Sequence, residues 1–383
     1  MNPLLTQLST YPTVALDEKK RQVRATGRTL YDFGVGDPIE PTPPHIREAM
    51  LAAIPEVSQY PTVQGPRALR EAIAAYMARR FGVTLDPATQ ILPTSGSKEA
   101  VFHLPLAFID PAAPDRTVVF PDPGYPAYSR GALFAGAETH CQRLEGDFLQ
   151  RPWEIPEDVL RRTRMLWINS PHNPTGAVMS LAHLAQIHAL CRRHDILLVA
   201  DECYADVYDD APPPSLLQVS DEGVLVIHSC SKRSGMTGYR SGFVAGDPRA
   251  VAAYRTLRVN PGVAPTDMTN AAAAAAWADD AHADARRALL RRKKAVFLDL
   301  FQELGLELVG SEATFYLWVR APEGHDEQSY ALALLEHGIV VSPGTFFGVS
   351  DAGAGYVRVA MVPPLEACRE AAAIWRTVHR EVT

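Results

Sequence analysis

Residues 181–202 read LAHLAQIHALCRRHDILLVADE. Leucine and isoleucine recur at helical spacing through residues 181–190, and the apolar run Ile196–Ala200 that follows has the length of a strand and ends at Asp201. A helical segment that leads into a continuous apolar strand is typical of a buried parallel sheet covered by helices. This stretch therefore predicts an α/β fold.

The same alternation extends over about residues 66–250. A segment of helical period lies between Pro66, a favoured first-turn residue, and Gly82, a favoured terminator. Because buried parallel strands need helices on both faces, we expect one large, doubly wound, mostly parallel sheet domain. Further apolar runs of strand length are Thr117–Phe120, Met165–Ile168, Val224–Ile227 and Gly242–Ala245.

The pattern changes after a long Ala- and Arg-rich helical stretch at about residues 266–304. Strands are predicted near residues 314–319, 339–341 and 356–361, with helices between and after them. This order predicts a smaller α+β domain that also recruits the N-terminal segment. We expect the large domain to cover residues 45–285 and the small domain residues 1–44 and 286–383.

Composition limits the classes of partner. The chain has 383 residues and a net charge of −7, and its longest basic run is the four residues 291–294, which argues against a nucleic-acid partner. No apolar run is long enough to span a membrane, and the first residues lack the features of a signal peptide. The five cysteines have no C-x-x-C spacing and the 12 histidines no H-E-x-x-H, so we expect a cytoplasmic protein without a metal site that binds small molecules.

Polar residues just after the apolar runs are the candidates for chemistry, because open parallel sheets bind ligands beyond the carboxyl ends of their strands. Each candidate segment alone has an ordinary explanation as a helix cap, a turn or a solvated loop. Their common location and order favour a shared site. The segments are Ser95-Gly96-Ser97-Lys98, Asn169 to Gly176 (NSPHNPTG), Asp201-Glu202-Cys203-Tyr204 and Ser229-Cys230-Ser231-Lys232.

The sequence resembles the fold-type I pyridoxal-phosphate enzymes, specifically the class I and II aminotransferases, over nearly its whole length. Ser229-Cys230-Ser231-Lys232 is followed by Gly238-Tyr239-Arg240-Ser241-Gly242, with Lys232 and Arg240 eight positions apart. The Asp201/Tyr204 pair and the Asn173-Pro174 turn precede them in family order. The resemblance implies a transaminase that uses pyridoxal 5'-phosphate.

Three of these residues are predicted to be catalytic. Lys232, at a strand end, can form an imine with the cofactor aldehyde, and its amine, once released, can move a proton. Asp201 supplies the buried carboxylate that keeps the pyridine nitrogen protonated, so that the ring withdraws electrons. Tyr204, together with Asn173, would donate hydrogen bonds to the phenolate oxygen and favour its charged form.

The cofactor phosphate needs several donors because it carries about −1.5 to −2 charges. The backbone N–H groups of Gly96, Ser97 and Lys98, at the start of a predicted helix, form an anion site. Ser229 adds a hydroxyl and Arg240 a bidentate guanidinium. We expect Arg240 to contribute most; the side-chain roles of Ser97 and Lys98 stay open, because relatives differ at those places.

Four further roles follow from the resemblance. Tyr125 would stack on the pyridine ring, although a core tyrosine is the alternative, and Tyr60 would reach the phosphate of the neighbouring subunit, which implies a homodimer. Arg358 would bind the α-carboxylate of the substrate, where the alternative is a surface arginine, and the backbone of Gly36 would approach the same carboxylate.

Within the family, scattered segments are most similar to the bacterial succinyldiaminopimelate transaminases of lysine biosynthesis. The implied reaction moves an amino group between glutamate and the keto form of N-succinyl-LL-2,6-diaminopimelate. Such a substrate has a distal anionic tail, for which Arg255 and Arg258 are candidates, although we favour solvated helix positions for both. The segments are Met1-Asn2-Pro3 with Tyr11-Pro12, Pro41-Thr42-Pro43, Ala276–His282, Thr314–Trp318 and Ala360–Cys368.

Other functions remain open at this point. Another class I aminotransferase, of the aspartate, aromatic or LL-diaminopimelate type, would carry the same cofactor residues. A carbon–sulfur lyase of the same fold would also use Lys232 and Asp201. A non-catalytic regulator with an aminotransferase-like domain would normally add a DNA-binding segment, and we expect none before Tyr31.

Overall fold

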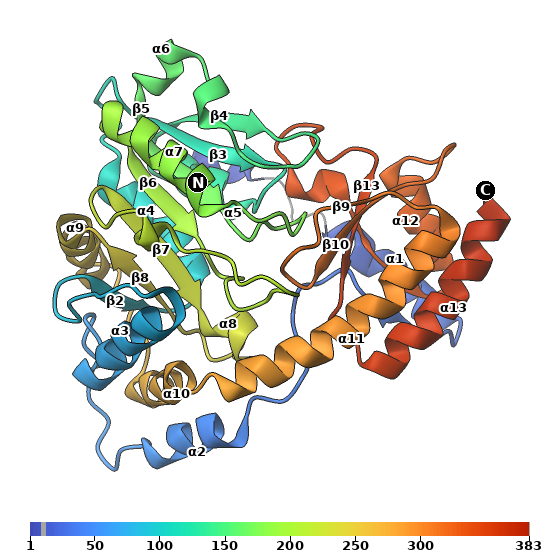
Figure 1. Ribbon diagram of the computed structural model, residues 1–383, viewed down its shortest axis with the longest axis horizontal. Helices are drawn as coiled ribbons and strands as arrows, with labels where there is room; N and C mark the ends of the chain where they lie inside the picture. The colour runs from blue at the N-terminus through green and yellow to red at the C-terminus, as the bar shows by residue number, and fades with distance from the viewer. Residues whose placement is uncertain (9–12, 383) are drawn as a thin grey trace.

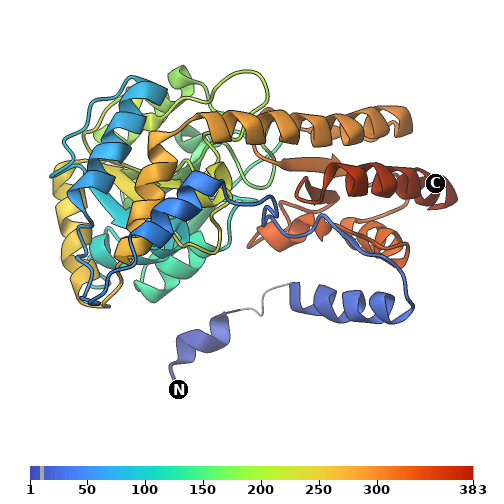
Figure 2. The same ribbon diagram turned by 90° about the horizontal axis from the view of Figure 1, so that it is seen from below.

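The computed structural model describes residues 1–8 and 13–382, so the Tyr11-Pro12 segment lies outside the described residues. Figures 1 and 2 show a larger part, built around a twisted sheet, and a smaller part that holds the C-terminus. The long helix α11 (Ala281–Leu304) runs from one part to the other.

The larger part contains a seven-stranded sheet in the order β2-β8-β7-β6-β5-β3-β4. Neighbouring strands are parallel except where β8 pairs with β2 and with β7. The predicted mostly parallel α/β sheet is therefore confirmed. The strands are β2 (Ile91–Thr94), β3 (Thr117–Asp122), β4 (Glu138–Arg143), β5 (Thr163–Asn169), β6 (Leu197–Asp201), β7 (Val224–Ser229) and β8 (Gly242–Gly246).

The reversed direction of β8 decides where Arg240 lies. Gly242, the first residue of β8, pairs with Ser229 at the end of β7 and with Thr94 at the end of β2. The residues that precede β8 therefore lie at the edge of the sheet where β2 and β7 end. This carboxyl edge of the strands is where α/β sheets bind ligands.

Each face of the sheet buries its own helices, because successive strand residues point to opposite sides. Val118 and Phe120 of β3 face a core formed with α4 (Ser97–Phe108), α5 (Ala127–Phe134) and α9 (Pro248–Val259). Val119 faces a second core formed with helices α3 (Arg67–Phe81), α7 (Leu181–Arg193) and α10 (Asp267–Ala278), and α2 (Pro44–Ala52) packs on α10. The doubly wound arrangement is confirmed, and the helix predicted between Pro66 and Gly82 is α3.

The smaller part combines C-terminal and N-terminal segments. An antiparallel sheet has the order β12-β13-β10-β9, and a separate parallel pair joins β1 to β11. Helices α12 and α13 pack on these strands, and α1 packs on α12. The elements are α1 (Thr13–Ala25), β1 (Tyr31–Asp32), β9 (Leu308–Val309), β10 (Tyr316–Arg320), α12 (Glu327–Glu336), β11 (Ile339–Val340), β12 (Ser342–Pro343), β13 (Tyr356–Ala360) and α13 (Leu365–Val382).

The helical stretch predicted at about residues 266–304 is two helices, α10 and α11. The chain turns at Asp279 and Asp280, and the Asp279 carboxylate accepts hydrogen bonds from the backbone N–H groups of Ala281 (3.2 Å) and His282 (3.1 Å). These bonds satisfy the first donors of α11 and start a new helix in a different direction. The predicted domain boundary at residues 285/286 falls inside α11 and stays a proposal.

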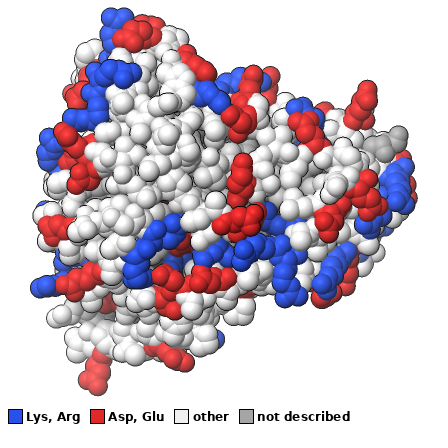
Figure 3. Space-filling model, in the orientation of Figure 1, with Lys and Arg blue, Asp and Glu red and all other residues white. Residues whose placement is uncertain are grey.

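The basic run of residues 291–294 does not form a basic surface. Lys293 and Lys294 are buried and paired with the carboxylates of Glu40 and Asp209. On the face shown in Figure 3, acidic and basic side chains are interspersed.

Among the described residues, we find no helix with the length and apolar character that crossing a bilayer requires. The short elements are η1 (Pro3–Gln7), η2 (Pro152–Glu154), α6 (Glu157–Leu160), η3 (Leu216–Gln218), α8 (Cys230–Arg233) and η4 (Gly344–Phe347).

Candidate active site

A cavity of about 430 Å³ lies at the carboxyl edge of the large sheet, closed on the other side by residues of the smaller part such as Ser342 and Phe347. Every predicted site residue except Gly96 and Tyr60 lines it. The lining residues that were predicted are Gly36, Ser97, Lys98, Tyr125, Asn173, Asp201, Tyr204, Ser229, Lys232, Arg240 and Arg358.

Lys232 lies in the short helix α8, directly after β7. The Ser229 hydroxyl accepts a hydrogen bond from the Ser231 backbone N–H at 3.1 Å and so caps this helix. The half-buried Lys232 ammonium donates to the Gly36 carbonyl and lies 5.5 Å from the centre of the Phe315 ring. The amine is thus held at the cavity wall between the large sheet and the N-terminal segment.

Asp201 ends β6 with its side chain buried and facing the same cavity. Burial raises the pKa of this carboxyl, while hydrogen bonds from Cys203 and Tyr128 act in the opposite direction. The Tyr128 hydroxyl donates at 2.9 Å and the Cys203 backbone N–H at 3.2 Å. A buried carboxylate supported in this way is suited to a cationic partner such as a protonated ring nitrogen.

Arg240 packs across Gly96, where an added Cβ would lie 2.5 Å from the arginine Nη2. Gly96 has φ +80°, so the backbone conformation disfavours other residues here, and a side chain would also displace the Arg240 guanidinium. Ser97 begins α4 beside it, and Ser229 comes from β7. A helix N-terminus, a guanidinium and hydroxyl groups converge here, which is a donor set suited to a phosphate.

Arg358 of β13 is only 6% exposed, so the alternative of a surface arginine is wrong. Its Nη1 donates to Asn173 Oδ1 and its Nη2 to the Gly34 carbonyl, both at 2.9 Å. Its Nε has no hydrogen-bond partner among the described residues, and its guanidinium lies 4.1 Å from the centres of the Tyr316 and Phe347 rings. A planar guanidinium in the cavity wall, which has more N–H groups than these two bonds use, fits a carboxylate ligand.

Two further residues line the cavity: Tyr316, which was not predicted, and Asn169, which belongs to a candidate segment but was given no role. The Tyr316 hydroxyl lies 2.9 Å from that of Tyr204, and burial raises the pKa of Tyr204. An added Cβ at Gly36 would overlap the Tyr316 hydroxyl, which explains the glycine at that place. Asn169 accepts a hydrogen bond from the Asn173 backbone N–H at 2.8 Å and so orients the loop that carries Asn173. Tyr316 lies in a strand whose apolar sequence predicts a buried core position, so the residue spacing did not indicate a role in the site.

The predictions for Tyr125, Tyr60 and two arginines have different outcomes. Tyr125 is half-buried and lines the cavity, whereas the Tyr60 side chain is fully exposed and lies outside it. The favoured solvated position of Arg258 is wrong: this residue is completely buried against Glu99. Neither Arg255 nor Arg258 lines the cavity.

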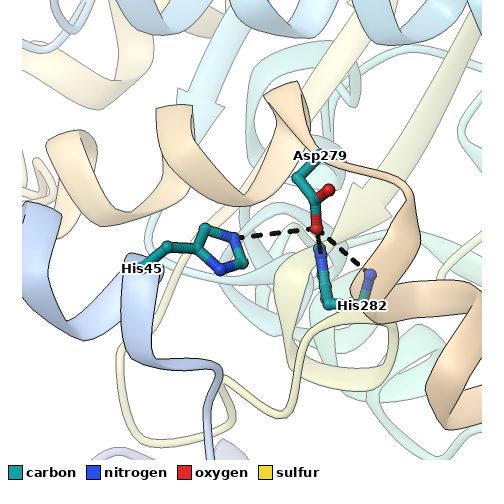
Figure 4. Close-up of side chains that lie close together, drawn as sticks. All are labelled: His45, Asp279 and His282. Carbon is teal, nitrogen blue, oxygen red and sulfur yellow. Dashed lines mark hydrogen bonds and ion pairs between the residues drawn. The ribbon is translucent and has the colours of Figure 1, made fainter.

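His45, Asp279 and His282 lie close together in the described part of the chain (Figure 4). His45 is far from the other two in sequence, so the sequence did not indicate this group. His282 Nδ1 lies 2.6 Å from Asp279 Oδ2, and its Nε2 lies 3.2 Å from Nη1 of Arg233 and 2.9 Å from the Ser234 hydroxyl. Because arginine can only donate, Nε2 must accept and Nδ1 must carry the proton. Both ring nitrogens are therefore engaged, and this geometry describes a hydrogen-bonded connection between helices.

Pyridoxal phosphate is the cofactor that the sequence resemblance implies, and the donor set of the cavity fits it. The phosphate donors around Gly96 and Arg240, the buried carboxylate of Asp201 and the amine of Lys232 stand along one cavity, with Tyr125 in its wall. These groups match the anionic, the cationic and the aldehyde portions of the cofactor respectively.

Comparison with known proteins supports the same interpretation. The sequence profile described as aminotransferase class I and II matches residues 28–374. The chain is 38% identical over 377 residues to LL-diaminopimelate aminotransferase 2 of Trichormus variabilis, which covers 96% of this chain and 95% of that protein. A solved aminotransferase from Neisseria meningitidis has a TM-score of 0.91 and 31% identity and covers 100% of both chains. A probable N-succinyldiaminopimelate aminotransferase from Thermus thermophilus has a TM-score of 0.89 and 30% identity and covers 95% of this chain and 99% of that one.

Proposed function

Because this chain belongs to the class I and II aminotransferases and is a pyridoxal-phosphate-dependent transaminase, we propose that it exchanges amino groups between glutamate or 2-oxoglutarate and a diaminopimelate-type amino acid. The family match and the names of the relatives favour transamination over the lyase and the regulator. The identity of the diaminopimelate-type substrate depends on the charged residues of the cavity.

We assign the predicted roles to the residues of the cavity. Pyridoxal phosphate supplies an aldehyde that accepts the amino group and a ring that withdraws electrons. Lys232 would bind the aldehyde and move the proton, Asp201 would keep the ring nitrogen charged, and Tyr204 would hydrogen-bond the ring oxygen. Arg358 would bind the α-carboxylate of each substrate with the donors that Asn173 and the Gly34 carbonyl leave unused.

The charge inventory of the cavity carries the proposal for the substrate. Its cationic side chains are Lys232, Arg240, Arg358 and Lys98. The first three are assigned to the aldehyde, the phosphate and the α-carboxylate, and we propose that the exposed Lys98 ammonium meets a second carboxylate. Asp37, exposed like Lys98, lines the same cavity and offers a carboxylate to an ammonium.

A distal end with both charges fits this pair best. Free LL-diaminopimelate carries a carboxylate and an ammonium there, whereas its N-succinyl derivative replaces the ammonium by an amide and adds a second carboxylate. We therefore favour the free LL form, in agreement with the name of the Trichormus relative. The N-succinyl form is the second candidate, supported by the name of the Thermus structure.

A panel of half-reactions tests this proposal. The holoenzyme is mixed in turn with glutamate, LL-diaminopimelate, N-succinyl-LL-diaminopimelate, aspartate and an aromatic amino acid, and the absorbance change of the cofactor gives each single-turnover rate. We expect glutamate and LL-diaminopimelate to react fastest. A faster reaction with the N-succinyl form would make that form the preferred substrate. A faster reaction with aromatic amino acids would exclude both diaminopimelate substrates.

We also propose a homodimer in which Tyr60 serves the neighbouring site. The end of α2 and the segment after it expose large apolar side chains that precede Tyr60 in the chain, namely Leu51, Ile54 and Val57. An apolar patch of this kind is typical of an interface, and Tyr60 does not line the cavity of its own chain. The cytoplasmic location stays a proposal from the sequence and suits the five free cysteines.

Complementation between subunits tests the homodimer. Lys232→Ala and Tyr60→Ala chains are purified separately, unfolded together and refolded as a mixture. A mixed dimer would contain one site with both Lys232 and Tyr60, so activity should return to about a quarter of the wild-type value. Activity no higher than that of the separate variants, or a monomer in sedimentation, would exclude the shared site.

A further inference from the structure

The guanidinium of Arg258 lies behind the phosphate site and is completely buried. Its Nε and Nη2 donate to the two carboxylate oxygens of Glu99, at 2.8 and 3.0 Å. Its Nη1 donates to the carbonyl oxygens of Pro93 at 2.8 Å and of Val63 at 3.2 Å. One side chain from α9 therefore holds β2, α4 and the segment that precedes α3.

Glu99 connects this arginine to the phosphate donors. Its Oε2 accepts a hydrogen bond from the Ser95 backbone N–H at 2.8 Å, next to Gly96, and its Oε1 accepts one from the Tyr254 hydroxyl at 2.7 Å. Burial raises the pKa of Glu99, but the hydrogen bond from His103 and the charge of Arg258 outweigh it and lower the pKa to about 2. The carboxylate thus remains ionised and fixes the turn that begins α4.

Val63 connects the same arginine to Tyr60, three residues earlier in the chain. The Gly65 backbone N–H donates to the Thr62 carbonyl at 3.0 Å and closes a turn. Gly65 has φ +68°, and a Cβ there would lie 2.9 Å from the ring of Pro93, so this turn packs directly on β2. The position from which Tyr60 leaves the surface therefore depends on the contacts made by Arg258.

We propose that Arg258 and Glu99 are a positioning pair that fixes two phosphate contacts at once: the donors around Gly96 in one subunit and the Tyr60 that this subunit presents to its neighbour. The inference rests on the proposed homodimer. It makes cofactor affinity depend on a buried ion pair that lines neither the cavity nor the exposed patch. Removing one partner of such a pair leaves the other charge buried and unpaired, so the turn that it holds must shift.

Cofactor titration of the apoenzyme tests the pair. The variants are Arg258→Lys, Arg258→Met and Glu99→Gln, and the control is Arg255→Met on the same helix. Tryptophan fluorescence gives the Kd of pyridoxal phosphate, and the Tm of the apoenzyme is measured in parallel. We expect Arg258→Met to raise the Kd about 30-fold or more, Arg258→Lys to raise it less because it keeps the charge, and the control to stay within about twofold.

The two measurements separate positioning from mere structure. A lower apoenzyme Tm with an unchanged Kd in all three variants would overturn the inference. If Arg258→Met does not fold, Arg258→Lys and Glu99→Gln carry the test, because each keeps a polar group in the same space.

A double-mutant cycle separates this inference from the homodimer on which it rests. Tyr60→Phe is combined with Arg258→Lys, and we expect the combined loss of affinity to be smaller than the product of the single losses, because both act on one contact. Independent effects would overturn the link to Tyr60. A monomer in which Tyr60→Phe has no effect would remove the homodimer, whereas a dimer in which the Arg258 variants bind the cofactor normally would remove the positioning pair alone.

Discussion

The hydroxyl of Tyr128 donates a hydrogen bond to Asp201 at 2.9 Å, while its ring stands edge-on to that of Tyr125, with the centroids 5.9 Å apart. Tyr128 is completely buried and stacks on Trp167 at 5.1 Å. One side chain therefore supports both the carboxylate proposed for the ring nitrogen and the aromatic ring proposed for the cofactor face.

Replacing Tyr128 with Phe should move the acid limb of the pH profile. The tyrosine hydroxyl stabilises the ionised form of Asp201, so its loss should raise the already raised pKa of this carboxyl further. A hydrogen bond to a charged group contributes about 1.5–3 kcal/mol. Neighbouring groups can replace part of this contribution after the substitution, so we expect the acid limb to shift by about one pH unit. The profile of kcat/KM against pH measures this shift to higher pH.

The control is Tyr31→Phe, which removes a hydroxyl bonded to Glu370 on the surface of the smaller part. It should leave the profile unchanged. A Tyr128→Phe enzyme with the wild-type acid limb would show that this hydroxyl has no influence on the charge of Asp201.

Arg240→Ala should weaken binding of pyridoxal phosphate by about 30-fold to a few thousand-fold. Arg240 is exposed in this structure, but the bound phosphate would cover it, and losing one partner of a charge pair that is desolvated in the complex costs roughly 2–5 kcal/mol. Gly96→Ala should also weaken it, since the new Cβ would displace the guanidinium and strain a residue at φ +80°. Equilibrium titration of the apoenzyme measures both. Arg249→Ala, on an exposed side chain paired with Asp247, is the control, and an unchanged affinity in Arg240→Ala would refute the assignment.

Arg358→Lys should separate substrate binding from cofactor binding. A lysine cannot reproduce the planar fork, so KM should rise about 100-fold for every amino-acid substrate, while the Kd of the cofactor changes little. Steady-state kinetics and the cofactor titration distinguish the two. An equal loss in both would mean that Arg358 supports the whole cavity rather than the α-carboxylate.

The sequence predicted the alternation of strands and helices and eleven of the residues that line the cavity, because polar residues that follow buried parallel strands share one edge. Asp201, Asn173 and Lys232 could be assigned in this way. Arg240 could not be found by looking for polar residues that follow a strand, because it precedes β8. It reaches the same edge only because β8 runs antiparallel to its neighbours. The resemblance to a family, and not the periodicity, placed it there.

The remaining site residues depend on contacts that a pattern does not encode. Tyr128 and Tyr316 lie in a buried helix and a buried strand, where a tyrosine is read as core. Arg258 was interpreted as solvated because its partner, Glu99, belongs to a helix far away in sequence. The pairing of His282 with His45 is hidden for the same reason.

Stability should fall as the pH is lowered from about 6.5 to about 4, through His172. Burial lowers the pKa of this histidine from 6.5 to about 4, and its Nε2 donates to the Pro123 carbonyl at 3.1 Å. Between these values the unfolded chain binds a proton that the folded chain does not, so the free energy of unfolding rises with pH there, by about 3 kcal/mol in total.

Urea unfolding at fixed protein concentration and several pH values measures this slope. In His172→Gln the side chain no longer titrates, so the variant should be less stable at pH 7 and approach the wild type as the pH falls to 4. The Glu99 contribution is lost only below its ordinary pKa of 4.5 and so lies outside most of this window. Parallel curves for the two proteins would exclude His172 as the source.

The charges at the cavity rim should decide between the two diaminopimelate substrates. Asp37→Asn removes the carboxylate proposed for the distal ammonium, so kcat/KM for LL-diaminopimelate should fall about tenfold, while that for the N-succinyl form stays the same or rises because a repulsion disappears. Lys98→Met should lower kcat/KM for both, since each has a distal carboxylate, and should spare alanine, which has none. Single-turnover rates with the three substrates provide the comparison at low and high salt. If Asp37→Asn lowered the rates for all three equally, the carboxylate would be acting on the cavity as a whole, and the preference for a distal ammonium would have to arise elsewhere.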